Sequence, residues 1–98
     1  MGFYRWDPTK NDRLMQERGV SFEEVLMAIE QGSLLDVLEN PNKERYGHQK
    51  VFVVEIRSYI YLIPFVEQGG ELFLKTIIPS RKLTRKYREE KEGGGGNE

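Results

Sequence analysis

Two periods of hydrophobic residues follow one another along the chain, and the change between them comes at Gly32. Before Gly32, the apolar residues recur at i, i+3, i+4 and i+7, which is the spacing of an amphipathic helix with one core-facing stripe. The stripe consists of Phe22, Val25, Leu26 and Ile29. After Gly32, apolar and β-branched residues follow the period of strands. The pattern therefore predicts helices in the first third of the chain and a sheet in its middle.

Capping residues mark the ends of two helices. Asp7 is suited to an N-cap with Pro8 at the first helical position, and Gly19 is suited to the left-handed residue after the last turn. Ser21-Phe22-Glu23-Glu24 is a capping box, which starts a second helix. We therefore expect one helix from Pro8 to about Arg18 and another that Gly32 closes.

Five segments have strand character, and turn residues separate most of them. They are Phe3–Trp6, Leu34–Leu38, Gln49–Ile56, Tyr59–Val66 and Leu72–Ile78. Arg57-Ser58 leaves enough chain for a tight hairpin, although it lacks the Gly or Asn that such turns prefer. Pro64 cannot donate a ladder hydrogen bond, so we expect a bulge or a sheet edge there.

The last helix is expected to start at Pro79-Ser80 and to end at about Lys91. The element order is then β-α-α-β-β-β-β-α. This order predicts an α+β fold, an antiparallel meander sheet with helices packed on one face. The 98 residues suffice for one domain, which we place at 1–92, and we expect 93–98 to be a flexible Gly-rich tail.

Composition removes several classes of site. The chain has no cysteine and one histidine, so thiolate nucleophiles, disulfides and His- or Cys-rich metal sites are excluded, and we expect no cofactor. No apolar run approaches the roughly 18–20 residues of a membrane span, and the first residues lack the apolar stretch of a secretory signal. We therefore expect a cytoplasmic protein that contacts no membrane.

The formal net charge of −1 conceals a cationic segment near the C-terminus. Between residues 75 and 88 there are six cations and no anion: Lys75, Arg81, Lys82, Arg85, Lys86 and Arg88. Such clustering indicates a site for phosphate or for an acidic protein partner. A solvated helix face is the alternative interpretation.

Cleavage of RNA by its own 2′-hydroxyl group is a chemistry that needs only cations and proton-transfer groups. It requires a base, an acid, and cations that hold the phosphorane, and it requires no metal. The candidate catalytic residues are Lys10, His48, Lys75, Arg81 and Tyr87. The candidate RNA-binding residues are Lys82, Arg85, Lys86 and Arg88. Three of these residues also have a structural interpretation: Lys75 as a surface lysine, His48 as an exposed histidine, and Tyr87 as an anchor of the last helix.

Three stretches together resemble the successive motifs of BrnT-type toxins, which are small RelE-like ribonucleases of bacterial type II toxin–antitoxin systems. They are Trp6-Asp7-Pro8-Thr9-Lys10-Asn11, Gly19-Val20-Ser21-Phe22-Glu23-Glu24 and Ser80-Arg81-Lys82-Leu83-Thr84. The resemblance runs from about Phe3 to Arg88. It implies a metal-independent endoribonuclease with Lys10, Lys75 and Arg81 in its site. It also implies a cognate antitoxin, typically a small ribbon–helix–helix DNA-binding protein, with which a heterotetramer can form.

The chain departs from the family pattern at several positions, so it resembles a divergent member. Glu17-Arg18 stands where the family usually has Lys-His, and Lys75 stands in a region that usually carries Arg. A non-catalytic RNA- or protein-binding module that keeps the toxin fold is therefore the alternative function, and a basic helix docked on an acidic partner is a third. For the nuclease, we expect Lys75 and Arg81 to share one pocket.

Overall fold

The computed structural model describes residues 3–39 and 49–97, the stretch 92–97 by its backbone alone. The elements are β1 (Tyr4–Arg5), α1 (Pro8–Arg18), α2 (Phe22–Glu30), β2 (Leu34–Glu39), β3 (Gln49–Ile56), β4 (Tyr59–Gln68), β5 (Glu71–Leu74), β6 (Ile78–Pro79) and α4 (Arg81–Asn97). The α+β class is confirmed. Within the described ranges the order is β-α-α-β-β-β-β-β-α, one strand more than expected.

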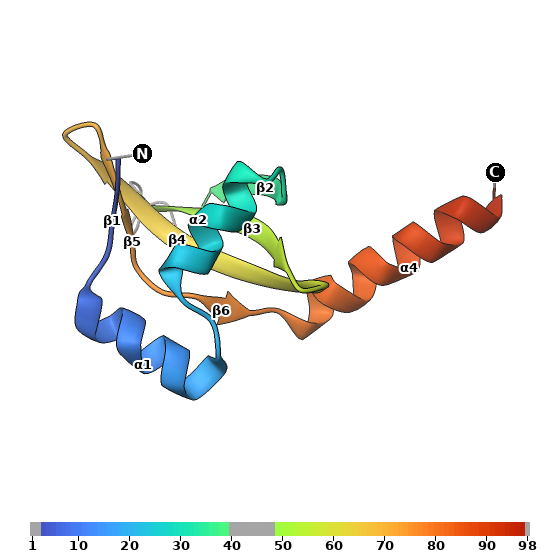
Figure 1. Ribbon diagram of the computed structural model, residues 1–98. Helices are drawn as coiled ribbons and strands as arrows, with labels where there is room; N and C mark the ends of the chain where they lie inside the picture. The colour runs from blue at the N-terminus through green and yellow to red at the C-terminus, as the bar shows by residue number, and fades with distance from the viewer. Residues whose placement is uncertain (1–2, 40–48, 98) are drawn as a thin grey trace.

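The sheet is mixed. Its strands run in the order β1-β5-β4-β3-β2, and β6 pairs with β4 (Figure 1). Strands β2 to β5 form the expected antiparallel meander, but β1 lies parallel to β5, with Tyr4 opposite Leu72. A purely antiparallel sheet was therefore the wrong expectation. Two helices separate β1 from the meander, and a crossover of that length allows a parallel strand.

The expected strand Leu72–Ile78 is divided into β5 and β6, and Pro64 gives the reason. The carbonyl oxygen of Pro64 accepts the Lys75 N–H at 2.8 Å, so this side of β4 faces the divided strand. The backbone N and C=O of one strand residue point to the same side of the strand. Pro64 has no N–H, so it cannot donate a hydrogen bond on the side that faces Lys75. The ladder is consequently interrupted between the β5 pairs and the β6 pairs. The irregularity predicted at Pro64 is found in the neighbouring strand.

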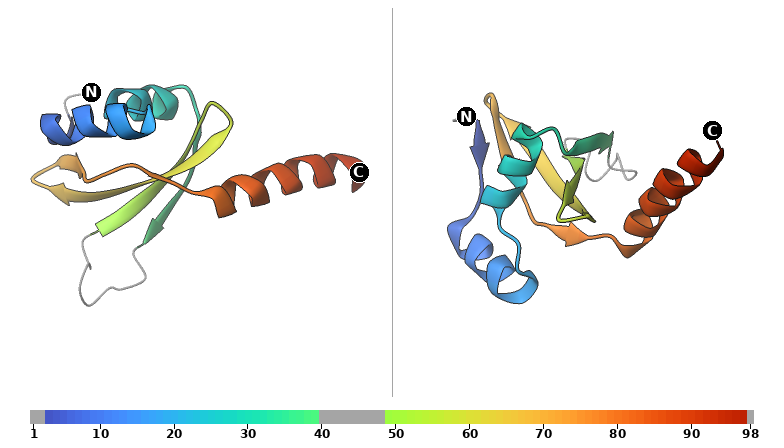
Figure 2. Two further views of the ribbon diagram at one scale, coloured as in Figure 1. Left: turned by 90° about the horizontal axis from the view of Figure 1, so that it is seen from below. Right: turned by 45° about the vertical axis from the view of Figure 1, so that its right-hand side comes forward.

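Helices α1 and α2 cover one face of the sheet (Figure 2), and the core lies between them and the strands. Phe22 and Val25 of α2 are fully buried, and the indole ring of Trp6 stacks on Phe22 with centroids 5.6 Å apart. The sheet contributes the buried side chains Phe52, Val54, Ile56, Ile63, Phe65 and Leu74, with Ile77 from the strand connection. This packing holds the end of the β3–β4 hairpin against the start of α2.

The predicted starts of α1 and α2 are confirmed, whereas α4 begins at Arg81 because Pro79 pairs with Tyr61 in β6. The Asp7 carboxylate accepts the Thr9 N–H at 3.0 Å, both bonds of the Ser21–Glu24 capping box are present, and Gly19 is left-handed with φ 68°. Each device satisfies a backbone group that the helix itself leaves unpaired.

Helix α4 behaves differently from α1 and α2. It contacts the sheet at β4 and then leads away from the body of the molecule (Figure 1 and Figure 2), so the expectation that every helix packs on one face was wrong. It also continues to Asn97, past the predicted end at about Lys91. The helical hydrogen bonds involve the backbone alone, so Gly93–Gly96 do not prevent them, although each glycine disfavours a helix by about 1 kcal/mol relative to alanine. None of the described helices is long and apolar enough to cross a membrane.

Candidate functional site

The first turns of α4 present three arginines on one face. Arg81, Arg85 and Arg88 follow the spacing i, i+4 and i+7, which places their side chains along one side of the helix. The side chains are exposed, and the first turn of α4 contains no acidic residue. Because the helix dipole adds positive potential at this end, the N-terminal part of α4 attracts anions.

The three arginines line a cavity of about 300 Å³, which we call the arginine cavity. Its other lining residues are Tyr59, Thr84 and Glu89. No ion pair among the described residues joins Arg81, Arg85 or Arg88 to a carboxylate. Arg88 donates one hydrogen bond to the Ser58 carbonyl, and all three guanidinium groups keep donors for a ligand.

Thr84 anchors this part of α4 to the sheet. It is 4% exposed, and its hydroxyl oxygen accepts the Ile60 N–H at 2.8 Å while its O–H donates to the Ser80 carbonyl at 2.7 Å. The Ser80 N–H in turn donates to the Ile60 carbonyl at 2.9 Å, and the Ser80 hydroxyl accepts the Leu83 N–H at 3.2 Å. These bonds fix the start of α4, and with it Arg81 and Arg85, relative to β4.

A second cavity, of about 210 Å³, lies on the other side of α4. It is lined by Leu35, Val53, Ile60, Leu83, Lys86, Tyr87 and Glu90. Successive residues of a helix are rotated by 100°, so the α4 residues of this cavity lie on the side of the helix opposite the arginines. They are Leu83, Lys86, Tyr87 and Glu90. Tyr87, a predicted catalytic residue, and Lys86, a predicted RNA-binding residue, therefore lie away from the arginine cavity. Lys82 is exposed and lines neither cavity.

The structure does not bring Lys75 or Lys10 to this cavity. Lys75 is exposed just beyond β5, and its ammonium group lies 5.3 Å from the Phe73 ring centroid. It lines neither the arginine cavity, nor the second cavity, nor the space lined by Glu24 and Arg57. Lys10 is half-buried in α1 and also lines none of them. Lys75 therefore does not share the arginine cavity with Arg81, as had been expected. His48 lies outside the described residues.

Tyr59 and Glu89 were not predicted as site residues. Tyr59 is the first residue after the tight turn Arg57-Ser58, and its ring lies 5.5 Å from that of Tyr61. Glu89 follows Arg85 by four residues, a spacing that the sequence already contains. The signal for Glu89 was therefore present, whereas Tyr59 reaches the cavity only because the hairpin end meets α4.

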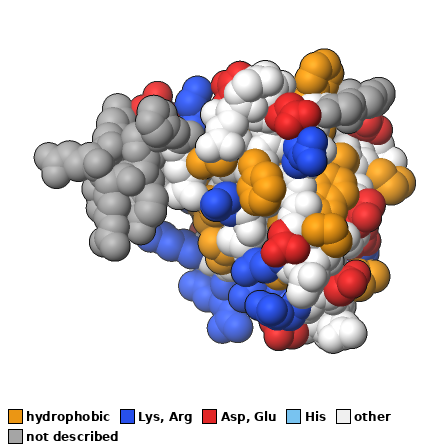
Figure 3. Space-filling view, turned by 90° about the vertical axis from the view of Figure 1, so that its left-hand side faces the viewer, with side chains coloured by type: hydrophobic (Ala, Val, Ile, Leu, Met, Phe, Trp, Pro, Cys, Tyr) orange, Lys and Arg blue, Asp and Glu red, His pale blue; other side chains and the backbone are white. Residues whose placement is uncertain are grey.

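The basic side chains are partly gathered in space. On the face seen in Figure 3, a group of Lys and Arg side chains lies along the lower edge, while others lie singly among acidic and apolar side chains. In the part of the chain that the structure describes, no group of three or more His, Asp and Glu side chains is placed to hold a metal ion.

Comparisons with protein-family models, with curated proteins and with solved structures find no match to this chain.

Proposed function

We propose that the protein is the toxin of a type II toxin–antitoxin system, a metal-independent endoribonuclease that cleaves RNA at the arginine cavity. The observation that carries the proposal is the composition of this cavity: three guanidinium groups, a phenol and a carboxylate line one space. These are the groups that attack by a neighbouring 2′-hydroxyl requires.

The arginines supply charge stabilisation. A guanidinium group can bind two phosphoryl oxygens at once, and the phosphorane formed during cleavage carries more negative charge than the diester. Arg81, Arg85 and Arg88 lie within two turns of one helix, so their fields add at one phosphate. Uncompensated cations next to each other are unfavourable without a ligand, and an anion relieves this repulsion.

Glu89 and Tyr59 supply the proton transfers. The Glu89 carboxylate removes the 2′-hydroxyl proton as the O2′–P bond forms, and the Tyr59 phenol donates its proton to the 5′-oxygen as the P–O5′ bond breaks. The products are a 2′,3′-cyclic phosphate and a 5′-hydroxyl end. Glu89 then releases its proton to solvent and the Tyr59 phenolate takes one up, which restores both groups. In this scheme Arg81 keeps its predicted role, while Lys10, Lys75 and Tyr87 take no part in the chemistry.

The proposal includes a protein partner, the antitoxin that the family resemblance implies. The sheet face opposite α1 and α2 exposes apolar side chains, among them Leu35 (39%), Leu38 (41%) and Ile78 (41%). Burial of such a patch stabilises an association by about 25 cal/mol per Å² of apolar surface removed from water. An antitoxin bound there would lie beside α4.

Incubation of the purified protein with a 5′-labelled RNA oligonucleotide in EDTA tests the nuclease. We expect cleavage that leaves 2′,3′-cyclic phosphate ends, and no cleavage where a 2′-deoxy nucleotide precedes the scissile phosphate. Arg85→Ala and Arg81→Ala should lower the rate by at least about a hundredfold, by analogy with loss of one oxyanion donor. A requirement for added metal, or full activity of the Arg81→Ala, Arg85→Ala double variant, would contradict the proposal.

A non-catalytic RNA-binding module is the second candidate, and the pair of tyrosines favours it. Tyr59 lines the cavity together with the arginines, and its ring is tilted against that of Tyr61, which packs against the core. Unpaired bases stack on such rings while cations hold the backbone. Binding without cleavage, with an affinity that falls steeply as salt rises, would select this function.

A further inference from the structure

The turn between β3 and β4 is strained. Arg57 and Ser58 have φ angles of 52° and 66°, in the left-handed region that side chains with a Cβ rarely adopt. Both residues are needed in this conformation for the two-residue turn that joins the strands. Gly or Asn at these two positions would relieve the strain. Because other residues are present, the turn persists only where surrounding contacts hold its backbone.

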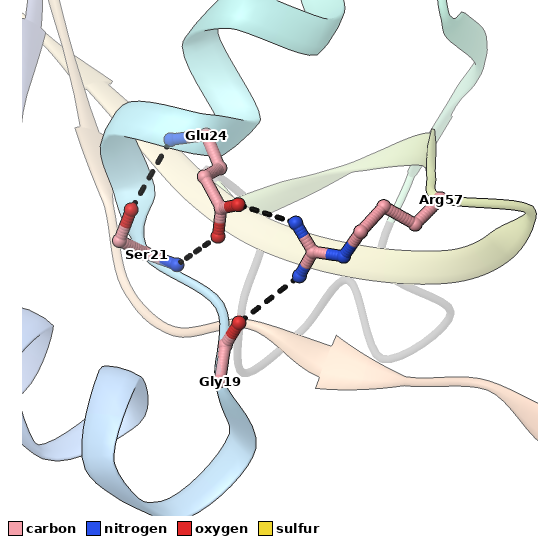
Figure 4. A network of polar contacts seen from close by, with 4 residues as sticks. All are labelled: Gly19, Ser21, Glu24 and Arg57. Carbon is pink, nitrogen blue, oxygen red and sulfur yellow. Dashed lines mark hydrogen bonds and ion pairs between the residues drawn. The ribbon is translucent and has the colours of Figure 1, made fainter.

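Arg57 makes those contacts. Its guanidinium donates to the Glu24 carboxylate at 2.5 Å and to the Gly19 carbonyl at 3.0 Å (Figure 4). The Glu24 carboxylate also accepts the Ser21 N–H at 3.1 Å, as part of the capping box of α2. Hydrogen bonding to Glu24 raises the pKa of Arg57. We call these contacts of Arg57 the clamp, and they tie the turn to the junction of α1 and α2.

The opposite side of the same turn belongs to the arginine cavity. The Ser58 carbonyl accepts a hydrogen bond from the Arg88 guanidinium at 3.4 Å, and Tyr59, the next residue, lines the cavity. Two of the groups in the cavity are therefore placed by a turn that the clamp holds from outside.

We propose that Arg57 is a positioning residue for the arginine cavity: through the clamp it holds the strained turn and thereby sets where Tyr59 and Arg88 lie. The inference rests on the function proposed above. Arg57 itself lines the separate space next to α2, together with Glu24, and not the arginine cavity. Its effect on RNA must therefore pass through the turn.

The variants Arg57→Asn and Glu24→Gln test this placement. Asn tolerates the left-handed conformation, so Arg57→Asn removes the clamp while keeping the turn residue compatible with its φ. Gln keeps an oxygen for the Ser21 N–H, so Glu24→Gln removes the charge and preserves the capping box. Gly69→Ala is the matched control. It strains the backbone of another hairpin, where Gly69 has a φ of 57°, and its added Cβ would meet nothing within 4 Å. The clamp stays intact in this variant.

Two measurements are made on each protein. The first is the Kd for a single-stranded RNA oligonucleotide with 2′-deoxy nucleotides, which cannot be cleaved. The second is the ¹H–¹⁵N spectrum of the free protein, read at the Tyr59 amide and the Arg88 Nε–H. We expect Kd to rise about fivefold or more in Arg57→Asn and Glu24→Gln, with both signals shifted. Gly69→Ala should leave Kd and both signals unchanged, and Arg57→Lys, which cannot reach both acceptors, should fall between.

The outcomes separate this inference from the proposed function. If wild-type protein binds no RNA, the proposed function fails, and the two spectral signals alone decide the inference. The positioning role of Arg57 would be overturned if both signals stayed at their wild-type positions in both clamp variants. It would also be overturned if Gly69→Ala raised the Kd as much as Arg57→Asn does.

Discussion

The side chain of Asn11 in α1 holds the first residue of α2, Phe22, by accepting its backbone N–H at 2.8 Å. The same side-chain amide donates to the Glu23 carboxylate at 2.8 Å. These bonds join two of the stretches that resemble the toxin motifs, residues 6–11 and 19–24. Asn11, like the capping residues beside it, thus has a structural task, so these motifs support the fold more directly than they support the chemistry.

Replacement of Asn11 by Ala should destabilise the protein in a pH-dependent way. Hydrogen bonding from Asn11 lowers the pKa of Glu23 from its ordinary value of 4.5. A lowered folded-state pKa contributes stability that is present above the unfolded value and is lost as pH falls through the folded value. The free-energy difference between wild type and Asn11→Ala should therefore be largest near neutral pH, and smaller below about 4.5. Loss of the Phe22 bond adds about 1 kcal/mol at every pH. Urea unfolding at several pH values measures both parts.

Asn11→Asp is the control for the pH dependence. It keeps an acceptor for the Phe22 N–H but places a carboxylate beside Glu23, so the stability of this variant should improve as pH falls toward 4. A difference between wild type and Asn11→Ala that is constant from pH 7 to pH 3 would contradict the role assigned to Glu23.

Thr84→Val should cost about 1–3 kcal/mol of unfolding free energy. Valine has the same shape but leaves the buried Ile60 N–H without its acceptor, and an unpaired buried donor is penalised by that amount. Thr84→Ser keeps the hydroxyl and should lose less. Thermal or urea unfolding of the two variants compares them, and equal stabilities would mean that the hydroxyl does not hold the start of α4.

Gly19→Ala should destabilise the protein by about 1–2 kcal/mol. The φ of 68° at this position is unfavourable for a residue with a Cβ, although the added atom would meet nothing within 4 Å. The backbone conformation alone is therefore being tested. Gly19→Asn should cost less, because Asn tolerates this region, and an alanine variant as stable as wild type would show that the α1–α2 junction can adopt another path.

Local chemistry explains why so much of the fold is predictable. The ends of α1 and α2 depend on side chains within three residues of each end, as at Asp7 and Ser21, so the sequence contains the whole signal. The direction of β1 and the division between β5 and β6 depend on strands far away along the chain. The sequence predicts an irregularity at Pro64 in β4. Only the pairing of β4 shows that the strand which is interrupted is its partner, divided into β5 and β6.

The candidate site, like the fold, could be predicted from the sequence only in part. The helical spacing of Arg81, Arg85 and Arg88 is visible in the sequence, and the structure places all three on one cavity. Whether a residue from another element faces that cavity depends on where α4 leaves the sheet. For this reason Tyr59 was missed, and Lys75 was placed in a pocket with Arg81 although it does not line the arginine cavity.

Arg85→Ala and Lys75→Ala should separate the arginine cavity from cationic charge in general. Each variant removes one positive charge, but only Arg85 lines the cavity, and Lys75 lies over the Phe73 ring. We expect Arg85→Ala to weaken binding of an uncleavable single-stranded RNA about tenfold and to reduce the dependence of log Kd on log salt by about 0.7, the value for one phosphate contact on a single strand. Lys75→Ala should change Kd less than twofold at physiological salt, where exposed charges more than about 8 Å apart are largely screened.

Fluorescence anisotropy over a salt series measures both quantities. Equal losses in the two variants would mean that RNA responds to overall charge, and a larger loss in Lys75→Ala would move the binding surface to the β5 side of the sheet.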